Sequence, residues 1–153
     1  MLSSLIVLAG CGSGHGRGSD AEQPLPFSTI SQGVFSRIEE QRLVVEHDQT
    51  MLEALWSEHV AGILPPPPVP TVDFRRDMLI GVFLGARPSG GFDVTIGSIV
   101  RTSAGVIVRF EEMAPGKGCF VTLAVTAPFH MVALPRSQAE VAFEGSKRVV
   151  DCP

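Results

Sequence analysis

The 153-residue sequence has little of what nucleic-acid-binding, membrane-spanning and metal-binding proteins require. Lys and Arg number 12 against 16 Asp and Glu, for a formal net charge of −4, and they form no basic block, so we expect no nucleic-acid partner. After the first ten residues the longest apolar run, Met78–Leu84, is far shorter than the roughly 20 residues that a membrane-spanning helix needs. The four histidines are scattered, without H-E-x-x-H or paired-cysteine spacing, so we expect no metal site.

Motifs for phosphate binding and catalysis are also missing. The glycines of residues 10–18 fit no frame of the dinucleotide fingerprint G-x-G-x-x-G, and residues 116–118 read Gly-Lys-Gly where a P-loop needs Ser or Thr after the lysine. No G-x-S-x-G occurs. The adjacent carboxylates Glu111 and Glu112 would point to opposite faces of a strand and could not act on one bond. We therefore expect no cofactor, no catalytic residue and no enzymatic activity.

An apolar run near the start of the chain ends in Leu8-Ala9-Gly10-Cys11. This tetrapeptide resembles the lipobox of bacterial lipoproteins at all four positions. The resemblance implies cleavage before Cys11, which makes residues 1–10 a signal peptide, and acylation of the cysteine by fatty chains such as palmitate. Two or more acyl chains anchor a protein stably, whereas one binds only marginally. Residues 11–26, which are rich in glycine, are then expected to be a flexible tether.

Gly12 stands where an Asp would retain such a lipoprotein at the inner membrane. We therefore expect a lipid-anchored protein of the bacterial cell envelope, at the outer membrane, with the membrane as a partner through the lipid. The alternative is that residues 1–10 are a buried strand and Cys11 a core residue, which the glycine run that follows fits poorly.

Acylation of Cys11 would leave two cysteines, Cys119 and Cys152, free to pair in an oxidising compartment. In the chain-entropy model such a disulfide would contribute roughly 3.5–4 kcal/mol. The alternative is a thiol enzyme in which Cys119 is the nucleophile and His130, across a hairpin, is its base. The sequence suggests no third member of a triad, so the disulfide is the preferred interpretation.

The first part of the folded region predicts a hairpin, a helix and a stiff connector. Residues 34–38 and 42–46 are short β-prone runs separated by three residues, as in a hairpin. Thr50-Met51-Leu52-Glu53 fits a capping box, and apolar residues follow at three- and four-residue spacing, which predicts an amphipathic helix over residues 51–61. The proline-rich stretch 64–70 stops this helix and predicts an extended connector.

The rest of the chain predicts strands and tight turns. Met78–Leu84 is apolar at nearly every position, as in a central strand covered on both faces. Residues 92–96 and 106–111 alternate apolar and polar side chains like half-buried strands, with a hairpin turn at Thr102–Gly105 between them.

Three further β-prone runs predict the end of an up-and-down meander: residues 121–125, 129–134 and 141–143. Residues 27–153 are thus predicted to form a single mainly-β domain, an antiparallel β-sandwich or open barrel with one N-terminal amphipathic helix. Because successive loops of a meander fall at opposite ends, the loops at residues 85–91 and 113–118 should lie together at one end and form a Gly/Pro-rich rim.

Three motifs of this region carry a family likeness: Pro88-Ser89-Gly90-Gly91-Phe92, Pro115-Gly116-Lys117-Gly118-Cys119 and the tail from Pro128 to Pro135. Together they resemble the C-terminal domain of the PrcB family, named for a subunit of a bacterial surface protease complex, over residues 72–144. The resemblance implies a role in assembly or stabilisation of a protease, and it brings no catalytic residues with it.

We therefore expect the rim to bind a protein partner, for which the resemblance suggests a protease. The candidate binding residues combine turn formers with charge and aromatic area: Arg87, Pro88, Ser89, Gly90, Gly91, Phe92, Pro115, Gly116, Lys117, Gly118 and Phe120. Two alternatives stay open. The same glycines and prolines are those that tight turns require, whatever they bind. The Pro88–Phe92 loop is also similar to a loop of chagasin-type cysteine protease inhibitors, which would make the chain a peptidase inhibitor.

Overall fold

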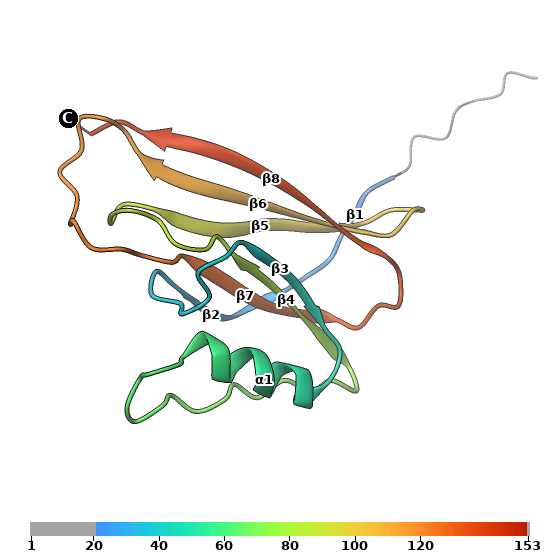
Figure 1. The fold of residues 1–153 in the computed structure, drawn as a ribbon. Helices are drawn as coiled ribbons and strands as arrows, with labels where there is room; N and C mark the ends of the chain where they lie inside the picture. Colours follow the sequence, from blue (N-terminus) through green and yellow to red (C-terminus); the bar gives the residue numbers. More distant parts are fainter. Residues whose placement is uncertain (1–20, 153) are drawn as a thin grey trace, which may run out of the picture.

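The structure is a computed structural model that describes residues 21–152. In chain order its elements are β1 (Gln23–Pro24), β2 (Ser28–Gly33), β3 (Arg42–Glu46), α1 (Gln49–His59), β4 (Asp77–Phe83), β5 (Asp93–Arg101), β6 (Val106–Pro115), β7 (Phe129–Pro135) and β8 (Val141–Val150). They form two four-stranded sheets, which we call sheet A (β1-β5-β6-β8) and sheet B (β2-β7-β4-β3) (Figure 1). The predicted mainly-β sandwich with one helix is confirmed.

β4 shows why the molecule has three layers. Met78, Ile80 and Val82 pack between the two sheets, whereas Leu79 and Phe83 pack on the opposite face of sheet B, under α1. All five side chains are fully buried. A strand covered on both faces needs apolar residues at successive positions rather than at alternate ones. The predicted central strand is confirmed, since β4 lies between β7 and β3.

α1 covers the outer face of sheet B, below the sandwich in Figure 1. It begins after Asp48, whose carboxylate Oδ1 accepts a hydrogen bond from the Met51 backbone N–H at 2.9 Å. The capping box predicted at Thr50 is therefore wrong. Asp48 is an equally good cap two residues earlier, and it places Thr50 inside the first turn. None of the helices in residues 21–152 is long and apolar enough to span a membrane.

The proline-rich connector is held against α1 by a side chain of the helix. The Trp56 indole N–H donates to the Pro67 carbonyl at 3.0 Å. Trp56 itself is buried in the layer between α1 and sheet B. The connector therefore runs back along the outer side of α1 (Figure 1), with most of its residues exposed.

His59, at the end of α1, is buried among aromatic rings. Its ring centroid lies 4.2 Å from that of Phe129 and 5.1 Å from that of Trp56. Its Nδ1 is hydrogen-bonded to the Ser36 hydroxyl at 2.9 Å. Burial lowers the pKa of His59 from 6.5 to about 4, so the imidazole is neutral at physiological pH.

The hairpin predicted from residues 34–38 and 42–46 is wrong. Residues 42–46 form β3, but they pair with β4. Residues 34–36 instead bond to the chain just before β7, where Ser36 N–H donates to the Ala127 carbonyl and Ala127 N–H to the Val34 carbonyl. Both runs are β-prone, and pairing of the second run with the edge of β4 also buries Val44 in the layer between sheet B and α1.

The predicted meander also needs correction in two places. Residues 121–125 form no strand and lie in the connection between β6 in sheet A and β7 in sheet B. β8 does not continue an up-and-down order, because it runs parallel to β6 with a ladder from Val106↔Val141 to Pro115↔Val150. The turn at Thr102–Gly105 is where we expected it, closed by a 2.8 Å bond from Thr102 N–H to the Gly105 carbonyl.

Residues on the N-terminal side of the predicted domain boundary at residue 27 contact sheet A. β1 pairs with the last residues of β5, and Leu25 N–H donates to the Ile99 carbonyl at 2.8 Å. Glu22 forms an ion pair of 2.6 Å with Arg109 of β6. Residues 22–26 of the predicted tether 11–26 are therefore part of the folded structure. Cys11 and the predicted signal peptide lie outside the described residues.

Candidate functional site

The two glycine-rich loops meet at one end of the sandwich. The first is the 85–92 loop between β4 and β5, and the second is the 116–128 segment between β6 and β7. Together we call them the rim. The start of β5 pairs with the end of β6, Asp93 opposite Met113, which brings the two loops to the same end. This part of the predicted arrangement is confirmed, because the β5–β6 hairpin alone is enough to produce it.

Backbone hydrogen bonds join the two parts of the rim directly. Arg87 N–H donates to the Thr126 carbonyl at 2.7 Å, and Thr126 N–H donates back to the Arg87 carbonyl at 3.0 Å. Gly90 N–H donates to the Thr122 carbonyl at 2.9 Å, and the Thr126 hydroxyl donates to the Ser89 carbonyl at 2.8 Å. The 85–92 loop is therefore fastened along its length rather than projecting freely.

The guanidinium of Arg87 is paired with a carboxylate inside the protein. Its guanidinium forms two bonds of 3.2 Å to the carboxylate of Glu112 on β6 and donates to the Leu84 carbonyl at 2.9 Å. The Arg87 and Glu112 side chains are only 21% and 15% exposed. Burial by itself would raise the pKa of Glu112, but hydrogen bonding and charge from Arg87, with help from Lys147, lower it overall. Arg87 thus positions the loop and is not available to a ligand.

Two glycines of the rim allow the close approach of the loops. Gly91 has φ +83°, and a Cβ there would lie 3.0 Å from Pro115 and from Val121. A Cβ at Gly90 would overlap the Thr122 hydroxyl. The interpretation of these glycines as turn and packing residues is supported by this geometry. They shape the rim but offer little contact area themselves.

A disulfide ties the rim to the end of the chain. Cys119 and Cys152 are bonded, with their Cα atoms 4.9 Å apart and a sequence separation of 33. Beside it, Gly116 N–H donates to the Val150 carbonyl at 2.8 Å, which continues the contact of β6 with β8. The predicted disulfide is confirmed, and it links the 116–128 segment to the chain just after β8.

The alternative of a thiol enzyme is wrong on two counts. Cys119 has no free thiol, because it is in the disulfide. His130 is buried on β7, where its Nδ1 accepts from the Ile96 N–H at 2.9 Å and its Nε2 is hydrogen-bonded to the Thr29 hydroxyl at 2.9 Å. Since Nδ1 accepts, Nε2 carries the proton of the neutral ring. Burial lowers the pKa of His130, against a smaller opposing effect of Asp93.

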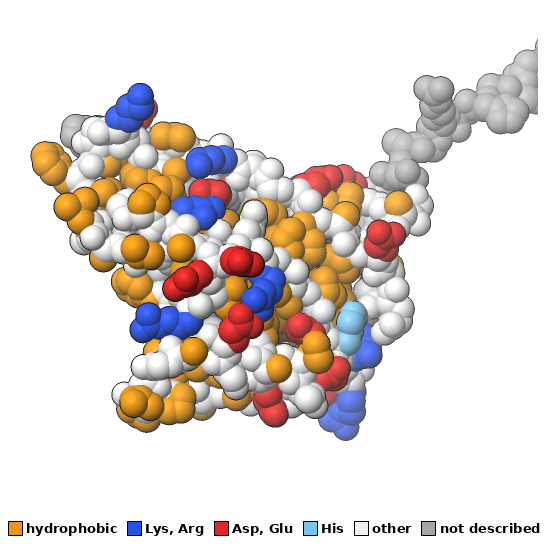
Figure 2. Space-filling view, in the orientation of Figure 1, with side chains coloured by type: hydrophobic (Ala, Val, Ile, Leu, Met, Phe, Trp, Pro, Cys, Tyr) orange, Lys and Arg blue, Asp and Glu red, His pale blue; other side chains and the backbone are white. Residues whose placement is uncertain are grey.

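Three large apolar side chains of the 116–128 segment point outward. Phe120, Leu123 and Val125 are 105%, 95% and 69% exposed. Phe35 from the neighbouring 34–36 stretch is also 69% exposed. Figure 2 shows hydrophobic side chains gathered at the end of the molecule where the chain ends, with Lys and Arg beside them. Large exposed apolar side chains held together on ordered backbone are typical of protein-binding surfaces.

Of these side chains, only Phe120 is among the binding residues predicted from the sequence. Leu123 and Val125 were assigned to a strand that would have buried alternate positions, so their exposure was missed. The remaining rim residues predicted to bind a partner differ in solvent exposure. Pro88, Lys117 and Gly118 are exposed, whereas Ser89 and Phe92 are half-buried and Pro115 and Gly116 pack against neighbouring chain.

A hollow of about 430 Å³ adjoins the rim on the side of sheet B. Phe35 and Val125 form its apolar wall, with Ile63 from the end of the α1 region, and Arg37 and Glu39 lie at its border. It is open to solvent and next to the exposed apolar residues. It therefore extends the rim into a surface with a recess, the shape that receives an anchoring side chain of a partner.

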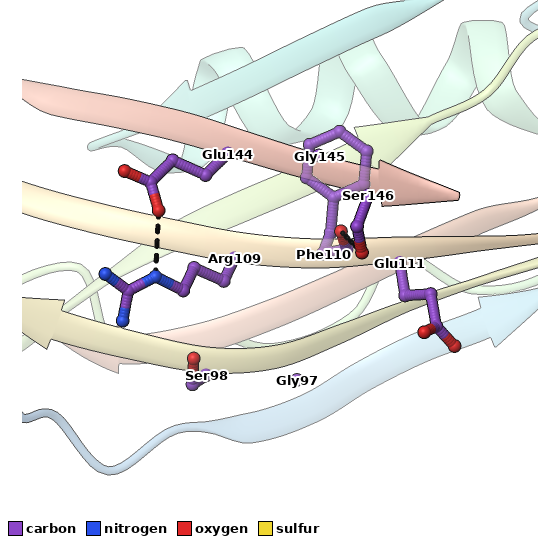
Figure 3. Close-up of a pocket in the computed structure, with 8 residues that line it drawn as sticks. All are labelled: Gly97, Ser98, Arg109, Phe110, Glu111, Glu144, Gly145 and Ser146. Atoms are coloured by element: carbon purple, nitrogen blue, oxygen red, sulfur yellow. Dashed lines mark hydrogen bonds and ion pairs between the residues drawn. The ribbon is translucent and has the colours of Figure 1, made fainter. Parts of the chain in front are cut away.

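A second hollow, of about 410 Å³, lies on sheet A (Figure 3). Its charged residues are already paired within the chain: Arg109 bonds to Glu144 at 2.8 Å and to Glu22, and Glu111 bonds to Arg148 at 2.8 Å. In residues 21–152 no group of three or more His, Cys, Asp or Glu side chains is placed to hold a metal ion. The rim is therefore the better candidate site.

Comparison with known proteins places the rim within a family match. Residues 78–135 match the family model of the PrcB C-terminal domain, which spans β4 to β7 and includes both loops of the rim. This family is an accessory domain rather than a known catalytic family. Neither the curated proteins nor the solved structures gave a match. The resemblance seen in the motifs of residues 88–92 and 115–119 is confirmed.

Proposed function

We propose that this chain is a non-catalytic lipoprotein of the bacterial cell envelope whose sandwich binds a protein partner through the rim and assembles or stabilises a secreted protease complex. The PrcB C-terminal match over residues 78–135 supports an association with a protease complex. The observation that carries the proposal is the exposure of Phe120, Leu123 and Val125 on a segment that a disulfide and the 85–92 loop hold in place. Such a surface binds with little loss of conformational freedom.

The position of the rim relative to the start of the fold supports a protein partner over the bilayer surface. β1 pairs with the last residues of β5, whereas the rim adjoins Asp93, the first residue of β5 (Figure 1). A nine-residue strand is about 30 Å long. A lipid anchor on the N-terminal side would therefore leave the rim at the far end of the sandwich, turned toward soluble or surface-bound proteins.

Co-purification of protease with the rim tests the assembly role. Wild type and the double variant Phe120→Ser/Leu123→Ser would be isolated from the native envelope, with Met51→Ser as a control, because Met51 is 50% exposed on α1 and outside the rim. We expect protease to co-purify with wild type and Met51→Ser and to be lost from the double variant. Equal recovery with all three chains would contradict a role for the rim.

Peptidase turnover separates this role from that of an inhibitor. An assembly subunit leaves the turnover of the captured protease unchanged or raises it, whereas an inhibitor lowers it. Gly90→Asp serves as the loop variant, since a side chain at Gly90 collides with Thr122 and displaces the 85–92 loop. Recovery of turnover in this variant, from a suppressed level in wild type, would favour the inhibitor.

Acylation is tested separately at Cys11. We expect radiolabelled palmitate to enter wild type but not Cys11→Ser, and the variant to be released from the membrane fraction. Labelling of both chains, or of neither, would remove the lipid anchor from the proposal while leaving the rim experiment unaffected.

A further inference from the structure

β8 is a long edge strand with one free side. It lies at the end of sheet A, pairs only with β6 among the described residues, and its ladder runs through all ten residues without a bulge. Most of its residues are exposed. Short length, a bulge, a proline or charged side chains commonly protect such an edge from pairing with another chain. Residues 141–150 have none of the first three features, but they carry Glu144, Lys147 and Arg148, so a further strand must match these charges. The edge is therefore able to accept a further strand.

Symmetry limits how two copies of β8 can pair. An antiparallel pair of identical edge strands in one continuous sheet is related by a two-fold axis perpendicular to the sheet. Such an axis places the inner faces of the two A sheets on the same side of the joined sheet. A residue of β8 whose side chain points to the inner face must therefore lie opposite a residue of the second copy that also points to the inner face. Only registers centred on a residue, and not between two residues, satisfy this condition.

The side chains select one of these registers. With Ser146 on the axis, Glu144 lies opposite Arg148 of the second copy, and by symmetry this pair occurs twice on the outer face. On the inner face Phe143 lies opposite Val149, which is 57% exposed in the single chain. Lys147, which is ion-paired with Glu112 of its own chain at 3.5 Å, lies opposite Gly145, whose inner face is covered by the Phe110 ring. Opposite charges and apolar pairs directly across strands stabilise a sheet.

The neighbouring registers are worse. Centring on Lys147 sets this lysine against its own copy, and like charges directly opposite each other are destabilising. Centring on Gly145 places Phe143 opposite Lys147 and leaves Glu144 opposite Ser146. We propose that the chain forms a two-fold dimer in which β8 pairs antiparallel with β8 of a second copy about Ser146, joining the two A sheets into one eight-stranded sheet.

Glu144 and Arg148 can take part without giving up their present partners. Glu144 bonds to Arg109, as Figure 3 shows, and Arg148 bonds to Glu111. Both side chains remain more than half exposed, at 54% and 56%. In the dimer the intrachain pairs on each side would connect through Glu144–Arg148 into a charge network across the axis. This charge pairing follows from the two-fold symmetry of identical strands, so it favours a second copy of β8 over a strand of a different protein.

Cysteine cross-linking tests the register on the full chain. Ser146→Cys places two thiols opposite each other with Cα atoms about 4.5–5.5 Å apart, within disulfide range. Ala142→Cys is the matched control, because it is exposed on the same face of β8 but lies about 26 Å from its own copy in this register. We expect mild oxidation to link Ser146→Cys chains through residue 146 and to leave Ala142→Cys unlinked. Equal linking of both variants, or of neither, would overturn the proposal.

Charge reversal at residues 144 and 148 tests the pairing of the two β8 strands, and it separates loss of the dimer from loss of folding. Glu144→Arg and Arg148→Glu each set like charges opposite each other twice, so each should be monomeric by sedimentation while wild type is dimeric. An equal mixture of the two variants restores opposite charges at both positions and should form mixed dimers. Circular dichroism of each variant checks that the monomer is folded. A monomeric wild type at the highest soluble concentration, or a mixture that stays monomeric, would overturn the proposal.

Discussion

Sheets A and B have the same number of strands but differ in what covers them. In sheet B both faces are buried, one by sheet A and one by α1, and β4 and β7 are apolar at nearly every position. In sheet A only the inner face is buried, and β5 and the first half of β6 alternate. The outer face of sheet A carries ion pairs such as Arg109–Glu144.

This difference separates stability from interaction. Sheet B and α1 contain most of the fully buried side chains, so substitutions there should act on folding. The rim and the disulfide lie at one end of sheet A, and β8 forms one of its edges. Substitutions at this end and edge should weaken binding to partners more than they lower the stability of the fold. The predictions below test this division.

The largest effect is expected at Phe83, in the layer between sheet B and α1. Phe83 is fully buried, with its ring centroid 5.9 Å from that of Phe129. Phe83→Ala leaves a cavity and should lower the free energy of unfolding by roughly 3–5 kcal/mol. Ile107→Ala on the outer face of sheet A is the control, expected to cost less than about 1 kcal/mol because that side chain is only partly buried. Urea denaturation of both variants measures the difference, and equal costs would remove the distinction between the sheets.

The disulfide should be the strongest single contribution at the border of sheet A. Its sequence separation of 33 predicts a loss of roughly 3.5 kcal/mol in the chain-entropy model for Cys119→Ala/Cys152→Ala. Because the bond joins the 116–128 segment to the end of β8, hydrogen exchange should rise there and not in β4. Uniform faster exchange throughout the chain would mean that the disulfide supports the whole fold and not the rim alone.

Acid should act through the helix layer. The pKa of His59 is about 4 in the folded chain, below the ordinary value of 6.5, so the unfolded chain binds this proton first. The stability due to His59 is therefore complete above pH 6.5 and is lost as the pH falls toward 4, by roughly 3 kcal/mol in all. His59→Phe should flatten this part of the stability profile relative to wild type. An unchanged slope in the variant would assign the acid sensitivity to other groups, of which the buried His130 is the next candidate.

The smallest effect is expected on the exposed face of sheet A. Arg109→Gln removes ion pairs to Glu22 and Glu144, but these groups are well solvated and their pairing is weak in water. We expect no measurable change in melting temperature at physiological ionic strength. A clear drop in the melting temperature of Arg109→Gln that disappears in high salt would show that these ion pairs contribute more to stability than solvated pairs are expected to.

Strong local patterns in the sequence predicted several elements correctly. The run Met78–Leu84 has apolar residues on both faces, and only a doubly covered strand suits it. Thr102–Gly105 combines turn residues between two alternating strands, so the hairpin could be placed before the structure was known. The Cys119–Cys152 pair followed from the count of cysteines available.

The errors arose where two local solutions were equally good. Asp48 and Thr50 are both suitable caps, and the docking of α1 on sheet B decides between them. Residues 121–125 have the composition of a strand, but they connect two strands of different sheets, and β6 and β7 are each already paired on both sides. β8 pairs in parallel with β6 because its connection crosses back from sheet B at the end opposite the rim, which residue patterns do not encode. The exposure of Leu123 and Val125 was missed because residues 121–125 were assigned to a strand.

The placement of β1 beside the end of β5 also has a mechanical consequence. A pull on residue 21 directed away from a partner held on the rim would act along the axes of β1, β5 and β6. The backbone bonds between these strands, and those of β2 with β7, would then be loaded in shear and would have to break together rather than one at a time. A domain arranged in this way resists extension along the line from residue 21 to the rim better than across that line.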